Sequence, residues 1–97
     1  MKLRFTPSAQ VEFIEAIDHI RQENPIAARG YSSRAKQALR RLEVFPNSGR
    51  RLPEFPDSLY REVIIPPYRF IYRAIGAAVW IITVWHDARI LENLPEM

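Results

Sequence analysis

The sequence predicts an α+β protein with the element order β-α-α-β-β-β, in which an antiparallel helical hairpin packs on one face of a curved, mainly antiparallel sheet. Two observations lead to this fold class. Apolar residues recur at helical spacing in the first half of the chain, whereas a period of two dominates the second half. Prolines, glycines and asparagines stand at the junctions between these segments. The length of 97 residues predicts a single domain, residues 1–97.

The N-terminal quarter predicts a strand followed by a helix. Leu3 and Phe5 alternate with basic residues, as in a short strand with one buried face. Thr6 is suited to cap a helix that has Pro7 in its first turn. Apolar residues then follow at helical spacing, at Phe13, Ile14, Ile17 and Ile20. We expect this helix to extend to about Glu23.

A second helix is predicted directly after the first. Asn24 and Pro25 repeat the combination of a capping residue and a first-turn proline. Its apolar seam comprises Ala28, Tyr31, Ala35, Ala38, Leu42 and Phe45, with Leu39 beside it. Pro46 ends the helix. Because the joint is so short, the two helices should form an antiparallel hairpin.

The second half of the chain predicts a loop and three strands. The loop extends from Pro46 to Ser58. The strands are expected at Tyr60 to Ile65, Tyr68 to Arg73 and Ala78 to Trp85, with turns at Pro66-Pro67 and around Gly76. The last strand is apolar at nearly every position, which indicates that both of its faces are covered and that it lies in the middle of the sheet.

The charge balance is basic. The chain contains fourteen Lys and Arg and eleven Asp and Glu, which gives a net charge of +3 and a pI near 9.7. Twelve of the fourteen basic residues are arginines. Arginine suits carboxylate and phosphate partners, so an acidic protein or a nucleic-acid-bearing partner is one interpretation. On charge alone, an ordinary soluble surface is the favoured interpretation.

Several classes of protein are disfavoured. The chain has no cysteine for a disulfide or a thiolate zinc site, which fits a reducing cytoplasm. Its longest apolar run, residues 77–85, is far shorter than the roughly 20 residues of a membrane helix, and it has no signal peptide. The two histidines are far apart and the three glycines form no phosphate loop. We therefore expect a soluble cytoplasmic protein with no membrane association, metal or cofactor.

Three motifs resemble those of the ParE/RelE toxins, and of the ParE branch in particular. They are Arg41-Leu42-Glu43-Val44-Phe45-Pro46-Asn47-Ser48-Gly49-Arg50, then Pro67-Tyr68-Arg69-Phe70-Ile71-Tyr72-Arg73, and finally His86-Asp87-Ala88-Arg89. The resemblance covers nearly the whole chain in order. It implies the toxin of a bacterial type II toxin–antitoxin module, bound by an antitoxin whose disordered C-terminal part folds around it. ParE-like members poison DNA gyrase, whereas RelE-like members cleave messenger RNA on the ribosome.

The choice between these branches depends on acid–base groups. Cleavage of RNA needs groups that accept and donate protons and positive charge on the phosphate. The resemblance places Arg69 where the RNA-cleaving branch has a phosphate-binding arginine, and His86 can titrate near neutral pH. However, residues 86–97 contain no tyrosine and one arginine, and a lone histidine after a buried strand is more often structural. We expect no catalytic residues; a RelE-like chain would use Arg69 and His86.

Three strand arginines, Arg61, Arg69 and Arg73, are candidates for antitoxin binding in the groove between the helical hairpin and the sheet. An alternative stays open, in which Arg69 and Arg73 form ion pairs with Glu62 or Asp87. Alternation places Tyr68, Phe70 and Tyr72 on the opposite face of that strand, as core.

The second helix also carries a basic face. Arg34, Arg40 and Arg41 can meet phosphates, but no aromatic platform lies beside them for bases to stack on. A solvated face or a surface for an acidic antitoxin segment is favoured, without sequence-specific DNA binding by this chain. We thus predict a ParE-like toxin that binds DNA gyrase and forms a hetero-oligomer with a ParD-like antitoxin. The alternatives are a ribosome-dependent endonuclease and a non-toxic binding module.

Overall fold

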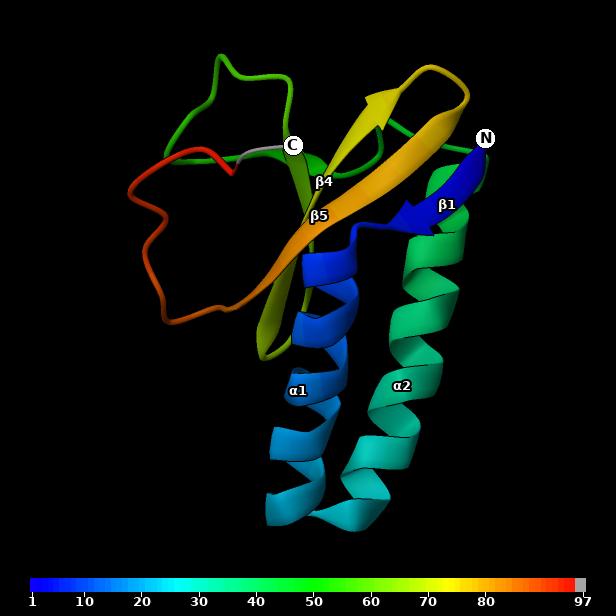
Figure 1. Ribbon diagram of the computed structural model, residues 1–97, viewed down its shortest axis with the longest axis vertical. Coiled ribbons are helices and arrows are strands. Elements are labelled where there is room, and N and C mark those ends of the chain that lie inside the picture. The colour runs from blue at the N-terminus through cyan, green and yellow to red at the C-terminus, as the bar shows by residue number, and fades with distance from the viewer. Residues whose placement is uncertain (96–97) are drawn as a thin grey trace.

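The structure is a computed structural model and describes residues 1–95. The elements are β1 (Lys2–Phe5), α1 (Pro7–Glu23), α2 (Pro25–Arg40), the 3-10 helix η1 (Arg41–Glu43), β2 (Arg50–Arg51), β3 (Arg61–Ile65), β4 (Tyr68–Ile75) and β5 (Ala78–His86). The sheet has the order β1-β5-β4-β3-β2, and among the strands of residues 1–95 only β1 pairs in parallel. The two helices form the antiparallel hairpin on one side of it (Figure 1). The predicted fold class is confirmed, with β5 inside the sheet.

Both helices begin at the predicted caps. The Thr6 hydroxyl accepts a hydrogen bond from Ala9 N at 3.1 Å, and the Asn24 side chain accepts one from Ala27 N at 3.1 Å. Each cap satisfies a backbone N–H that has no partner within the helix, and the proline that follows needs none. Since α2 begins one residue after Asn24, the connection is tight enough to reverse the chain.

The end of the second helix differs from the prediction. The α-helix stops at Arg40 and continues as η1, and Phe45, predicted to belong to the apolar seam, is 57% exposed. Proline disfavours helical backbone in the residue before it, so Pro46 prevents the helix from extending through Phe45. The short strand β2 was also not predicted, because two residues are too few to show a period. None of the described helices is long and apolar enough to cross a membrane.

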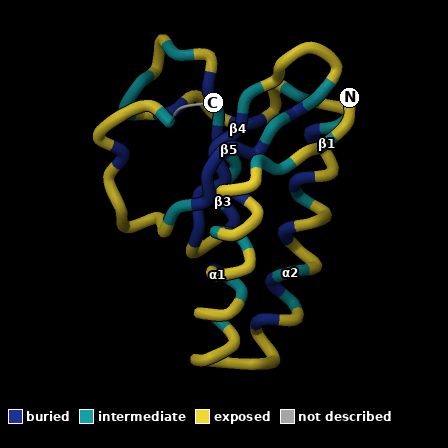
Figure 2. The backbone as a smooth tube through the Cα atoms, viewed as in Figure 1, coloured by how far each residue is buried: buried dark blue, intermediate teal, exposed yellow. Residues whose placement is uncertain are grey.

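Each face of the sheet has its own apolar core. The core on the helix side is built around Phe70, Tyr72, Ile81, Leu39 and Tyr31, each at most 1% exposed. The core on the other side consists of Leu52, Tyr60, Ile71, Ile82 and Leu91, with Phe55, Trp80 and Trp85 against it. Residues 52–60 and 87–95 cover this second face (Figure 2). This second cover explains why β5 is apolar along both faces.

Candidate partner-binding site

The first two sequence motifs meet at Tyr72. Its hydroxyl donates to the carbonyl of Pro46 at 2.7 Å and accepts from Gly49 N at 2.9 Å. Burial raises the pKa of Tyr72, so the hydroxyl retains the proton that it donates. A Cβ at Gly49 would lie 2.5 Å from this oxygen, closer than packed atoms approach. The loop after η1 is therefore fixed against β4.

Arg69 is the buried centre of a chain of charges. Its Nε lies 2.7 Å from Glu62 Oε1, and its two terminal nitrogens lie 2.6 and 2.8 Å from the Glu54 carboxylate. Glu62 also accepts from Arg50 Nε at 2.5 Å, and Glu54 accepts from Leu91 N at 3.2 Å. This charge chain joins β2, β3 and β4 to the loop and to the C-terminal segment.

The charges within this chain compensate each other. Arg69 is 4% exposed and Glu62 is 1% exposed, so neither is stable there without its partner. The hydrogen bonds from Arg69 lower the pKa of Glu54 to about 2, and the pKa of Arg69 is raised chiefly by the bond to Glu54. The ion pair between Arg69 and Glu62, one of the alternatives considered from the sequence, is present. The pair with Glu54 was not predicted.

The structure separates the three arginines that were predicted to bind the antitoxin. Cross-strand pairing of Arg61 with Tyr72 places Arg61 on the helix side of the sheet, whereas Arg69 and Arg73 point to the second face. They therefore do not share one groove. A two-residue turn at residues 66–67 pairs Ile65 with Tyr68 and hence fixes this register. This short turn is the feature of the sequence from which the faces of the three arginines could have been predicted.

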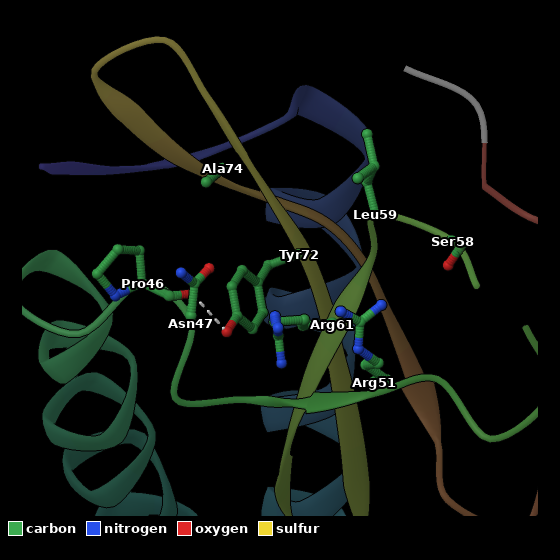
Figure 3. Close-up of a pocket in the computed structure, with 8 residues that line it drawn as sticks. All are labelled: Pro46, Asn47, Arg51, Ser58, Leu59, Arg61, Tyr72 and Ala74. Carbon is green, nitrogen blue, oxygen red and sulfur yellow. Dashed lines mark hydrogen bonds between the residues drawn. The ribbon is translucent and has the colours of Figure 1, made fainter. Parts of the chain in front are cut away.

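Arg61 lines a small pocket together with Arg51 (Figure 3). Arg61 donates to the carbonyl of Gly49 at 2.9 Å, and Arg51 donates to the carbonyl of Pro56 at 3.2 Å. The volume is about 180 Å³, and the lining comprises Pro46, Asn47, Arg51, Ser58, Leu59, Arg61, Tyr72 and Ala74. Arg51 was not among the predicted site residues, because only its place in the two-residue strand β2 aligns it with Arg61.

Arg73 retains free hydrogen-bonding capacity. Its guanidinium lies 5.8 Å from the centre of the Tyr60 ring, and its Nε is buried without a hydrogen-bond partner in residues 1–95. Within the same part of the chain, no carboxylate lies within 4.0 Å of Arg61 or Arg73. Arg61 and Arg73 thus differ from Arg69, whose charge is satisfied internally.

His86 is not brought together with Arg69. It pairs with Tyr68 across β4 and β5, which puts its side chain on the face opposite to Arg69. Its Nδ1 accepts from Ala88 N at 3.1 Å, and its ring lies edge-on to Tyr68 with centroids 5.4 Å apart. These contacts favour the structural interpretation of His86 over the catalytic one.

Comparisons with known proteins agree with this fold. A family model described as "ParE toxin of type II toxin-antitoxin system, parDE" matches residues 3–91. The chain is also similar to a solved structure, the chromosomal ParDE TA system from P. aeruginosa, at 19% identity and a TM-score of 0.73. That match covers 89% of this chain and 95% of the other. No curated protein matches.

Proposed function

The chain belongs to the ParE toxin family of type II toxin–antitoxin systems, and we propose that it acts in the cytoplasm by binding DNA gyrase until a ParD-like antitoxin neutralises it. The observation that carries this proposal is the family match over residues 3–91, nearly the whole described chain. Net charge +3 and pI near 9.7 suit an acidic antitoxin segment.

We propose that inhibition occurs by binding, without turnover of a substrate. The arginine that an RNA-cleaving relative would use, Arg69, is 4% exposed and holds two carboxylates, so binding a phosphate would require breaking both ion pairs. His86 projects from the other face of the sheet. Both features support a docking function for the domain.

For the antitoxin we propose an amphipathic segment that folds on binding, with Arg61 and Arg73 as direct anchors. Both guanidiniums lack a carboxylate partner within residues 1–95, so an acidic partner gains charge-assisted hydrogen bonds there. Arg69 contributes indirectly, because its charge chain holds β3 and β4, which carry the two anchors.

The proposal is tested by expressing the chain from a tightly repressed promoter, with and without a ParD-like antitoxin, which we expect to be encoded by a short reading frame directly upstream. We expect growth arrest that co-expression of this candidate antitoxin prevents. Purified chain should inhibit supercoiling by gyrase, and primer extension should show uncut ribosome-bound transcripts. His86→Ala serves as the matched variant and should behave like the original chain in all three assays.

Two outcomes would contradict the proposal. Codon-positioned cuts in ribosome-bound transcripts that disappear in His86→Ala would identify a RelE-type endonuclease. Normal growth with a soluble, folded chain would identify a non-toxic binding module of the same fold.

A further inference from the structure

We propose that Arg51 and Arg61 together form a receptor for one carboxylate side chain of the antitoxin. The inference rests on the proposed antitoxin partner and adds a specific contact to it. The two arginines line the pocket in Figure 3, at the edge of the sheet where β2 and β3 pair.

A pairing of like charges supports this assignment. Arg51 and Arg61 are direct partners across β2 and β3, an arrangement that destabilises a strand pair. The neighbouring pair, Arg50 and Glu62, has opposite charges and forms an ion pair. β2 and β3 thus carry a pair of opposite charges on one face and a pair of like charges on the other. An anionic partner would remove this repulsion.

Both arginine side chains are held in place, yet most of their N–H groups remain available to a ligand. Arg61 donates to the carbonyl of Gly49 and Arg51 to the carbonyl of Pro56, so each uses one of its five N–H groups. In residues 1–95 no carboxylate lies within 4.0 Å of either guanidinium. Fixing the arginines beforehand reduces the entropy lost on binding.

The remaining lining favours an acidic peptide over a nucleic acid. Pro46, Leu59 and Ala74 contribute apolar surface, and Leu59 is 71% exposed. Tyr72 is the aromatic residue of the pocket, but it is 1% exposed and its hydroxyl is occupied, so it offers no stacking surface for a base. A carboxylate flanked by apolar side chains matches both parts of the lining.

The test uses the isolated chain and a labelled peptide of alternating glutamate and leucine at low ionic strength. Fluorescence anisotropy should show that Arg51→Gln and Arg61→Gln each weaken binding about tenfold. Arg29→Gln, which removes an exposed arginine near the start of α2, should change it about twofold or less. Without peptide, Arg51→Gln should raise the melting temperature, because the repulsion is relieved, and Arg29→Gln should not.

Three results would overturn the inference. The first is equal peptide affinity of all variants. The second is undetectable peptide binding by the unsubstituted chain. The third is tighter binding of oligo-uridylate that both pocket substitutions abolish, which would assign the pocket to nucleic acid. If any of these results is found while co-expression of a ParD-like antitoxin still prevents growth arrest, only the pocket assignment fails and the proposed function stands.

Discussion

The backbone N–H of Gly49 donates to the Tyr72 hydroxyl at 2.9 Å, and this contact joins two motifs through residues that lie 23 positions apart in the chain. A Cβ at Gly49 would also meet Tyr72 Cε1 at 2.6 Å and the Glu62 carbonyl at 2.7 Å. The glycine is therefore required by close packing.

Gly49→Ala should destabilise the fold by about 1–3 kcal/mol, because the rigid Tyr72 ring and the β3 backbone must move. Gly30→Ala is the matched control. Its Cβ would meet only the flexible end of Arg34 at 3.3 Å, and alanine is favoured in a helix, so stability should rise by up to about 1 kcal/mol. Urea unfolding measures both. Equal effects of the two substitutions would contradict the packing argument.

Tyr72→Phe should lower stability by about 1–3 kcal/mol, since it leaves the Pro46 carbonyl and Gly49 N–H without their partner. Tyr68→Phe is the comparison, because the Tyr68 hydroxyl makes no hydrogen bond within residues 1–95. It should change stability by about 0.5 kcal/mol or less. Thermal unfolding distinguishes the two, and a Tyr72→Phe variant as stable as Tyr68→Phe would refute the role of the hydroxyl.

Arg69→Met should destabilise the protein by about 3–5 kcal/mol, because it leaves the partly buried Glu54 carboxylate without a cation and the buried Glu62 carboxylate with the exposed Arg50 alone. Adding Glu54→Gln and Glu62→Gln to this variant should recover much of the loss. Arg73→Met, which breaks no ion pair in residues 1–95, should cost about 1 kcal/mol or less. If Arg69→Met leaves stability unchanged but weakens the antitoxin complex, Arg69 is a direct anchor after all.

Stability should fall in acid through Glu54. Its pKa drops from 4.5 to about 2 on folding, so the ionised form is favoured in the folded state. The ionised Glu54 therefore contributes about 3 kcal/mol to the free energy of unfolding. This contribution is present above pH 4.5 and is lost as the pH falls towards about 2. Glu54→Gln should flatten the urea-midpoint profile in this window, whereas the exposed Glu15→Gln should not. Parallel profiles for the two variants would rule out the Arg69 bond as the cause.

Arg73→Gln should weaken the antitoxin complex about tenfold at low salt, and less at high salt, if the Arg73 guanidinium, which has no carboxylate partner within residues 1–95, receives an antitoxin carboxylate. Isothermal titration against the purified antitoxin measures this change. Arg29→Gln provides the control for loss of one positive charge elsewhere. An unchanged affinity in Arg73→Gln would remove Arg73 from the proposed antitoxin surface.

Local signals in the amino-acid sequence were sufficient to predict the helices and most of the strands. The caps at Thr6 and Asn24 act within three residues, and the helical and strand periods arise within single segments, so the order of helices and strands could be predicted. The inward direction of Tyr68, Phe70 and Tyr72 followed from alternation along one strand.

Which arginines lack a carboxylate partner within residues 1–95 depends instead on contacts between distant segments of the chain. The partner of Arg69 in the loop, Glu54, meets it because residues 52–60 and 87–95 fold back over the second face of the sheet. No periodic pattern encodes that contact, because it depends on where two irregular segments come to lie. The alignment of Arg51 with Arg61 likewise depends on the register of a two-residue strand, which only cross-strand hydrogen bonds establish.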